Sequence, residues 1–457
     1  MIVPRSRLIL FAAVVLLPFA AIAGALPEHA AVTGMFLGSF LIAVLADAAL
    51  ALGRLDGVAA TLPEVVRLTK DREGTIEIRI TNERLRLRRV RLAPALPREF
   101  TCPRETVEAL LPPDTVHSTV PWPCTPGKRG RFLLDAVYLE AASPVGFWAV
   151  RKCCRIRSEA RVYPNLFEDR KHLAALFLNR GAFGIHAQRQ VGKGREFEKL
   201  RDYIPGDSFD DIHWKATAKR GRPVSKVFQI ERTQEVYVVV DASRLSARLP
   251  GGERVPLRDE SPGAAVSAPA DYIERFITAC LILGAAAEQQ GDRFGLVAFD
   301  DRIRRFVRAS GGKSHYGTCR DALYTLEARI VNPDYEELCT FIRLRLRRRS
   351  LLVILTSLDD PALAESFVRN ADLISRHHLV LVNMIQPPRT RPLFSDEGVE
   401  RTDDVYRALA GHIQWHDLRE LERVLHRRGV TLSLLDNAKM CVQLVAQYIG
   451  VKQRQLL

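Results

Sequence analysis

Gly194 to Arg220 reads G-R-E-F-E-K-L-R-D-Y-I-P-G-D-S-F-D-D-I-H-W-K-A-T-A-K-R, and we call this stretch the signature segment. It separates a β-rich half of the chain from a half in which strands and helices alternate. Pro205-Gly206 predicts a turn, because proline presets its backbone and glycine tolerates the left-handed region. Asp207 or Ser208 can then cap a helix by accepting hydrogen bonds from its free N–H groups.

The helix predicted in the signature segment has charges at both ends. Asp210 and Asp211 would lie in its first turn and Lys219 and Arg220 in its last, as the helix dipole favours. Gly221 suits the left-handed position that follows a helix. The segment is therefore expected to contain a turn and one capped helix.

The composition is that of an ordered protein. Of the 457 residues, 47% are hydrophobic and 26% are charged, enough for two or three cores. The formal net charge of +14 favours anionic neighbours. The 8 cysteines form no C-x-x-C pair, which favours buried free thiols in a reducing compartment.

The N-terminus carries two apolar runs, Leu8–Leu26 and Ala31–Gly53, and only Asp47 interrupts the second. Each run is long enough to span a bilayer as a helix. A cleavable signal peptide is the alternative for the first run, but the second run follows at once, which favours a retained two-helix anchor. We expect Asp47 to reach water at the headgroups.

Basic residues flank both runs. Arg5 and Arg7 precede the first, and Arg54, Arg67 and Lys70 follow the second. The positive-inside rule therefore predicts that both termini, and most of the chain, are cytoplasmic.

After the anchor the hydrophobic period changes to two. Ile76, Ile78 and Ile80 share one face of a predicted strand, and Arg84–Arg88 alternates in the same way. The alternation predicts a basic strand face, which could meet anionic lipid or nucleic acid, with a solvated face as the ordinary alternative. Several short strands with turns between them indicate a small β-sandwich. Further strands are expected at Val116–Val120, Gly130–Leu139 and Trp148–Arg157.

The second half alternates strands with helices, which predicts a doubly wound, Rossmann-type α/β sheet. Buried strands are predicted at Glu235–Asp241, Phe294–Phe299, Leu351–Thr356, His378–Met384 and Val430–Leu435, after a first strand at Val224–Ile230 and with a short basic one at Arg302–Arg308. Helices are predicted at Tyr272–Gln290, Tyr316–Glu327, Tyr335–Arg348, Ala362–Arg376, Asp403–Arg428 and Ala438–Ile449. Ligands of such sheets bind at the carboxyl ends of the strands, where Asp241, Ser243 and Ser357 would lie.

The signature segment, with Pro205-Gly206-Asp207 and Ile212-His213-Trp214-Lys215, resembles the domain-of-unknown-function 58 (DUF58) family of bacterial membrane-anchored proteins. Gly130-Arg131-Phe132 and the stretch from Ser143 to Phe147 are similar to that family's β-module. The resemblance implies an inner-membrane protein with a von Willebrand factor A-like domain and a MoxR-type AAA+ ATPase as partner. The implied domains are 1–55 (membrane hairpin), 56–165 (β-sandwich), 166–232 (linking signature region) and 233–457 (α/β domain).

Von Willebrand factor A domains often hold Mg²⁺ at a D-x-S-x-S motif with a threonine and an aspartate from other loops, and hard oxygen ligands suit that ion. Here Asp241 and Ser243 fill the first two positions, but Leu245 replaces the second serine. Ser357 stands where the second aspartate belongs, with Asp359 two residues on, and Thr318 is the candidate threonine. We therefore expect no resident metal or other cofactor.

Two functions follow from these patterns. The first is a non-enzymatic scaffold that docks a protein, using the signature residues for partner or inter-module contacts. These residues are Arg195, Arg201, Asp202, Tyr203, Gly206, Asp207, Asp211, Trp214 and Lys215. The second is a metal-assisted phosphodiester hydrolase that uses the acidic signature cluster with His213 and Lys215. No nucleic-acid-binding module is recognisable, and anionic membrane lipid accounts equally well for the basic charge.

Overall fold

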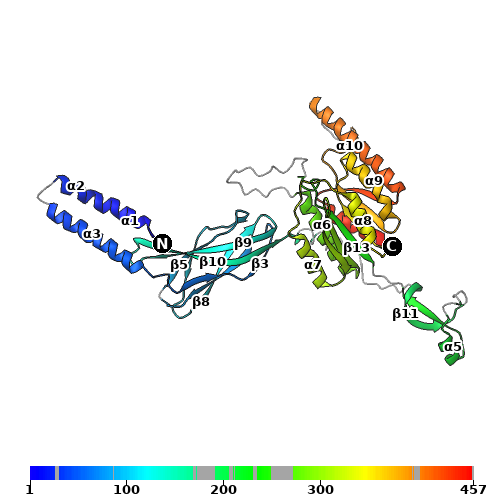
Figure 1. The fold of residues 1–457 in the computed structure, drawn as a ribbon, viewed down its shortest axis with the longest axis horizontal. Coiled ribbons are helices and arrows are strands. Elements are labelled where there is room, and N and C mark those ends of the chain that lie inside the picture. Colours follow the sequence, from blue (N-terminus) through cyan, green and yellow to red (C-terminus); the bar gives the residue numbers. More distant parts are fainter. Residues whose placement is uncertain are drawn as a thin grey trace. The chain divides into compact units, whose positions relative to one another are not determined.

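The chain divides into two compact units, one from Met1 to Asn165 and one from Leu166 onward. The computed structural model (Figure 1) describes residues 1–25, 30–85, 87–167, 171, 191–204, 209, 212–229, 234–248, 271–393, 395 and 402–454. Each unit is described by itself below.

The first apolar run forms a helix with a widened centre. It consists of α1 (Ser6–Phe11), a π-helical stretch (Ala12–Leu16) and α2 (Leu17–Ala25). Pro18 has no N–H to offer the carbonyl four residues earlier, and π-helical turns are one way in which a helix accommodates such a gap. The proline thus accounts for the interruption.

The second apolar run forms α3 (Ala30–Ala51). Within the described residues, Ala31–Ala51 is the one helix long and apolar enough to cross a membrane, with a mean hydropathy of 2.0, and a shorter apolar helix covers Ser6–Ala21. The rings of Phe19 and Phe36 lie 5.6 Å apart, so α2 and α3 are in contact (Figure 1). One candidate span is therefore present, and the second span stays a prediction.

The rest of the first unit consists of two β-sheets around a shared apolar core. One sheet has the order β1-β10-β9-β5-β7, with β3 parallel to β10, and the other has the order β2-β4-β8-β6. The core takes Ile76, Ile78 and Ile80 from one sheet and Leu134 and Val137 from the other, as the period of two requires. The strands are β1 (Ile2–Pro4), β2 (Val58–Thr61), β3 (Val65–Thr69), β4 (Gly74–Asn82), β5 (Arg89–Pro94), β6 (Phe100–Thr101), β7 (Val107–Leu110), β8 (His117–Pro126), β9 (Gly130–Ala142) and β10 (Trp148–Tyr163).

The basic strand predicted at Arg84–Arg88 is wrong. Leu85 has a φ of 52°, in the left-handed region that interrupts a strand, and β5 begins only at Arg89. The exposed Arg84 lies 3.8 Å from Asp56, so this arginine belongs to a turn rather than to a strand face.

Asp47 does not reach water, contrary to the sequence-based expectation. Its carboxylate is 1% exposed and accepts hydrogen bonds from the Ser143 hydroxyl (2.6 Å), the Val145 N–H (3.0 Å) and the Phe147 N–H (3.2 Å). The Trp148 indole N–H donates to the Val44 carbonyl of α3 (3.0 Å). The loop that resembles the family's β-module thus binds the end of α3.

The same loop also holds the first apolar helix. β1 pairs antiparallel with β10, with Ile2 opposite Val150, so the chain before α1 is part of the sheet. The ring of Phe147 lies 5.6 Å from Phe11 of α1 and 5.9 Å from Phe40 of α3. Both apolar helices are therefore tied to one loop at the end of the sheet.

The second unit is built around a six-stranded sheet of order β15-β14-β13-β16-β17-β18, in which β15 alone is antiparallel. This is the order typical of doubly wound sheets. The strands are β13 (Glu235–Asp241), β14 (Arg293–Phe299), β15 (Ile303–Ser310), β16 (Leu351–Leu355), β17 (Leu379–Ile385) and β18 (Val430–Leu435). The helices are α6 (Tyr272–Gln289), α7 (Lys313–Leu323), α8 (Tyr335–Arg345), α9 (Pro361–Ser375), α10 (Thr402–Arg427) and α11 (Met440–Gln453).

Helices cover both faces of this sheet, which explains why its central strands are continuously apolar. In β13, Val238 and Val240 face a core shared with α6 and α11, whereas Tyr237 and Val239 face a core shared with α8 and α9. From β13 onward the strands and helices follow the predicted order, with boundaries displaced by a few residues. The predicted first strand, Val224–Ile230, instead pairs with β11 outside this sheet.

The signature segment forms a β-hairpin with a short helix in its connection. β11 (Val191–Asp202) pairs antiparallel with β12 (Val224–Gln229), and α5 (Trp214–Arg220) lies between them. The predicted helix start was wrong, because α5 begins after His213, whose ring nitrogen accepts from the Ala216 N–H. Its end was right, since Gly221 has a φ of 65°.

Replacing Asp47 with alanine should loosen the attachment of α3. The change leaves the N–H groups of Val145 and Phe147 without this acceptor, at a cost of about 1–3 kcal/mol for the buried Phe147 group. We expect these two amides to exchange hydrogen at least about tenfold faster in the full chain in detergent, measured by mass spectrometry. Asp56→Ala, which removes only the exposed pair with Arg84, is the control, and equal protection in both variants would contradict the prediction.

Candidate functional site

The candidate site lies at the carboxyl ends of β13, β14 and β16, and we call it the rim. Asp241 ends β13 and is fully buried. One carboxylate oxygen accepts from the Ser243 N–H at 2.8 Å, and the other accepts from the Thr356 hydroxyl at 2.6 Å. Thr356 follows β16, so two neighbouring strands position these groups.

A second hydroxyl extends this contact into the core. The Tyr335 and Thr356 hydroxyl oxygens are 2.9 Å apart, and Tyr335 is buried at the start of α8. Burial raises the pKa of the Asp241 carboxyl group above its ordinary value. It also raises the pKa of the Tyr335 hydroxyl well above its ordinary value. These four residues form a linear chain of hydrogen bonds, from Ser243 through Asp241 and Thr356 to Tyr335.

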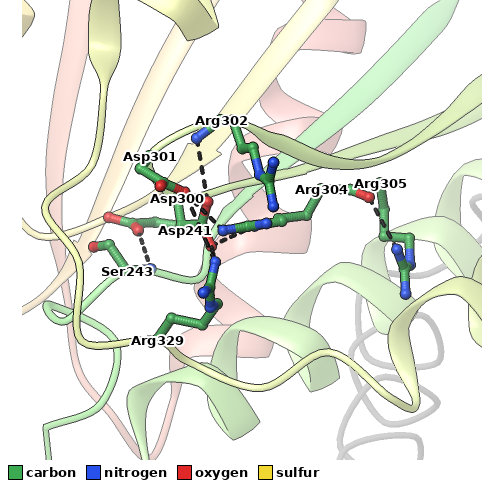
Figure 2. Close-up of polar contacts among 8 residues, drawn as sticks. All are labelled: Asp241, Ser243, Asp300, Asp301, Arg302, Arg304, Arg305 and Arg329. Atoms are coloured by element: carbon green, nitrogen blue, oxygen red, sulfur yellow. Dashed lines mark hydrogen bonds and ion pairs between the residues drawn. The ribbon is translucent and has the colours of Figure 1, made fainter.

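A second buried carboxylate, Asp300, follows β14 and is paired with arginines (Figure 2). β15 turns back antiparallel and places Arg304 Nε 2.6 Å from one Asp300 oxygen. Arg329, from the connection after α7, approaches the same oxygen at 3.6 Å, and the Arg302 N–H donates to the other oxygen at 3.2 Å. Two guanidinium groups thus contact the same oxygen of this carboxylate.

Asp301 is the exposed member of the same group. Arg304 donates to it at 2.7 Å while also donating to Asp300, so one guanidinium joins the two carboxylates. Burial raises the pKa of Asp300, whereas hydrogen bonds from Asp300 and then Arg304 lower the pKa of Asp301 to about 2. Of the two groups, Asp300 therefore has the higher affinity for a proton.

The loop after β16 adds two more ion pairs. Asp359 pairs with Arg248 and accepts from the Ser357 hydroxyl at 2.8 Å. Asp360 pairs with Arg244 at 2.9 Å and caps α9 through the Ala362 N–H, and the Arg244 hydrogen bond lowers its pKa. Both carboxylates of this loop, Asp359 and Asp360, therefore form an ion pair with an arginine.

These residues do not fit a magnesium site. Ser243 Oγ accepts the Leu245 N–H at 3.3 Å, both Asp241 oxygens accept hydrogen bonds, and Asp359 is held by Arg248. Thr318 lies in α7, where its hydroxyl donates to the Ser314 carbonyl, so it was the wrong threonine, and Thr356 contacts Asp241 instead. Among the described residues, no three His, Cys, Asp or Glu side chains are grouped so as to hold a metal ion.

The signature residues are only partly described. Gly206, Asp207 and Asp211 lie outside the described residues, and Arg195 lies in β11 with its side chain outside them. The structure brings Arg201, Asp202 and Tyr203 to the end of β11 and places Trp214 and Lys215 at the start of α5.

The contacts of these residues are mainly local. Asp202 pairs with Arg222 at 3.2 Å, the Tyr203 N–H donates to the Pro223 carbonyl, and the Tyr203 ring stacks on Phe209 at 6.1 Å. Trp214 is 69% exposed rather than part of a core. His213 is engaged in capping α5, which removes one ring nitrogen from general-base chemistry.

The sequence reasoning missed the arginines and aspartates that make up most of the rim. Asp300 and Asp301 directly follow the predicted strand Phe294–Phe299, and the carboxyl ends of parallel strands meet at one edge, so they could have been placed beside Asp241. Arg304 and Arg329 carried no such signal, since their positions depend on the return of β15 and on the loop after α7.

Replacing Arg304 with alanine should destabilise the α/β domain. Asp300 would lose a charge-assisted hydrogen bond while staying buried, a loss of about 2 kcal/mol. Arg305→Ala is the matched control, because the exposed Arg305 donates only to the Arg304 carbonyl. Chemical unfolding of both variants should show the loss only for Arg304→Ala, and equal stabilities would mean that Arg304 does not stabilise the buried Asp300.

Comparison with known proteins extends the sequence resemblance. Residues 199–249 and 253–405, under half of the chain, match the family described as "Protein of unknown function DUF58". This region includes part of β11, α5 and the sheet from β13 to β17. The sequence matches no curated protein. The resemblance to DUF58 is thus supported for the centre of the chain and stays a prediction for the anchor and the β-module.

Several solved structures are similar to part of the chain. BatB from Bacteroides thetaiotaomicron is 12% identical, with 48% of this chain and 99% of that chain covered and a TM-score of 0.29. An aerotolerance-related membrane protein from Bacteroides fragilis is 13% identical, with 48% and 98% covered and a TM-score of 0.27. An uncharacterized membrane-spanning protein from Vibrio fischeri is 18% identical, with 48% and 98% covered and a TM-score of 0.17. Scores of this size support no conclusion on function.

Proposed function

We propose that this chain is a membrane-anchored, non-enzymatic scaffold that presents its α/β domain to a protein partner. The partner is a MoxR-type AAA+ ATPase, as the DUF58 resemblance implies, and the complex serves protein assembly or chaperoning. The anchor consists of two spans in a bacterial inner membrane with both termini in the cytoplasm. The α/β domain is von Willebrand factor A-like, and it carries the rim at the carboxyl ends of β13, β14 and β16.

The observation that carries this proposal is the pairing of carboxylates with arginines at the rim. Asp300, Asp359 and Asp360 are each matched by a guanidinium, and Asp241 is buried behind two hydrogen bonds. Metal-assisted hydrolysis at the rim would need free oxygen ligands and a base, which this arrangement does not offer. The acidic signature cluster of the alternative hydrolase lies mostly outside the described residues. A rigid surface of paired charges instead suits recognition of another protein, in which complementary charges give specificity.

Exposed apolar side chains of the signature hairpin are a second support. Ile204, Phe209 and Trp214 are 51%, 74% and 69% exposed. Large apolar side chains that gather on one small module are typical of a surface that another protein or module covers. This favours the predicted contact role of the signature residues.

The anchored loop supports a scaffold held close to a bilayer. The loop at Ser143–Phe147 binds both apolar helices through Asp47, Phe11 and Phe40. The β-module then stands on the same side of the membrane as the N-terminus, near anionic headgroups that attract its arginines.

Altering an exposed arginine of the rim should weaken binding of the ATPase. Arg329 is half-exposed and contacts Asp300 and Asp301, and we expect Arg329→Ala to reduce affinity for a purified MoxR-type ATPase at least about tenfold. Affinity is measured with the full chain in nanodiscs and ATP. Arg369→Ala on α9, exposed and away from the rim, is the control, and undiminished binding by Arg329→Ala would argue against the rim as the docking surface.

The cytoplasmic orientation can be read from one cysteine. Among the described cysteines, Cys153 is the exposed one and Cys102 is half-buried. In intact cells we expect a membrane-impermeant maleimide to leave Cys153 unlabelled, and in inverted inner-membrane vesicles to label it. Cys153→Ser controls for Cys102, and labelling of Cys153 in intact cells would place the β-module outside and reject the proposed topology.

A further inference from the structure

The six-stranded sheet ends in an unprotected edge at β18. This strand reads V-T-L-S-L-L, and within the described part of the chain it pairs with β17 alone, on one side. It carries no charge and no proline, the features by which proteins usually prevent an edge from pairing with another chain. Its free backbone groups therefore form a template for a further strand.

The opposite edge of the same sheet is different. β15 carries Arg304, Arg305 and Arg308, and Arg305 and Arg308 are exposed. Its pairing with β14 also contains two register shifts. Charges and irregular pairing protect an edge from strand addition. The β15 edge of this sheet has both features, whereas the β18 edge carries no charge.

A groove of about 730 Å³ runs along β18 between α10 and α11. Residues of β18, together with Leu379 and Leu381 of β17, line it on the sheet side. On the helix side it is lined by residues that include Leu418 of α10 and Ala446 and Gly450 of α11. Gly450 has no side chain to fill the space beside it, and no other atom lies within 4 Å of the position that a Cβ would take there. Two helices thus flank the free edge.

Polar groups without partners lie in and behind this groove. Gln447, which lines it, has a buried side-chain oxygen with no hydrogen-bond partner among the described residues. Asn383 of β17 is fully buried, lies opposite the groove residue Ser433, and has both side-chain polar atoms without a partner among those residues. Buried amides of this kind are normally paired. Of the two, Gln447 lines the groove, and its unpaired oxygen favours an occupant that supplies a hydrogen-bond donor.

The charge of the groove favours an acidic occupant. Arg419 and Glu422 in its lining pair with each other at 2.7 Å and cancel. Arg454, which ends the lining at the α11 side, is exposed and makes no ion pair within the described part of the chain. One unmatched guanidinium remains, and it fits a carboxylate.

We propose that β18 accepts an extended segment of a partner protein, with apolar side chains at alternate positions and a carboxylate that reaches Arg454. The segment adds a seventh strand to the sheet through main-chain hydrogen bonds, a known mode of peptide recognition. A sheet edge of a second copy would bring its own flanking helices against α10 and α11, so a single extended segment fits the groove better. This site goes beyond the proposed function, since it lies at the sheet edge and not at the rim.

The probe is a fluorescent acetylated peptide amide, Glu-Val-Thr-Val-Ser-Val-Thr, titrated into the full chain in nanodiscs and followed by anisotropy. Two further peptides carry N-methyl groups on one or the other alternate set of backbone nitrogens. Strand addition predicts that one methylated peptide binds at least about tenfold more weakly while the other binds as the parent does, because only one set of N–H groups faces β18. Absence of binding by the parent, or equal binding by all three peptides, would overturn the proposal.

Variants locate the binding. Thr431→Lys places a charge on an exposed position of β18 and should reduce affinity at least about tenfold, with an unchanged unfolding temperature. Arg454→Glu should weaken binding of the peptide that carries Glu and strengthen binding of a peptide with Lys in place of that Glu. This comparison does not depend on whether Thr431→Lys folds. Arg305→Glu on β15 is the matched control and should bind as the parent protein does.

Two outcomes distinguish this site from the rim and from a dimer interface. Arg329→Ala should bind the peptide unchanged, so that failure here and failure of the rim are distinguishable. If the chain dimerises in sedimentation and Thr431→Lys disperses the dimer, the groove belongs to a second copy and the proposal is overturned.

Discussion

A carboxylate that leaves water must be compensated by donors from the protein, and this constraint organises both units. Asp47, Asp241, Asp292 and Asp300 are almost fully buried. Asp292 follows the pattern of the other three: Tyr448 and Lys452 of α11 donate to it, together with the Gln234 N–H. Each of these carboxylates has at least one partner from a distant segment, namely Ser143, Thr356, Tyr448 and Arg329 in turn. Each buried carboxylate therefore fixes a long-range contact that hydrophobic packing alone would not specify.

The sequence was most informative where local pattern and tertiary environment agree. The buried strands of the α/β half are apolar on both faces, so Glu235–Asp241 and Leu351–Thr356 were recognisable without any knowledge of their neighbours. Gly221 was equally readable, since a helix end that needs a left-handed residue selects glycine. These features depend on short stretches of chain.

The failures arose where a partner far away in sequence decides the structure. The alternation of Arg84–Arg88 is genuine, but Leu85 adopts a left-handed turn there. Asp47 was expected to reach water at the headgroups, because no residue near it in sequence indicates a donor. Its donors lie in the distant Ser143–Phe147 loop. At the rim, Asp241 and Ser243 were found from a motif, whereas Arg304 and Arg329 arrive from a returning strand and a loop that no local pattern marks.

The pairing of β1 with β10 has a consequence for biogenesis. β1 is synthesised well before its partner strand, which begins at Trp148, and the loop that binds Asp47 is also made after the apolar helices. The apolar helices therefore leave the ribosome before either partner exists, since chains fold from the N-terminus during synthesis. Their docking onto the β-module follows synthesis of β10, and a nascent chain stalled before Ser143 would hold its apolar helices without this support.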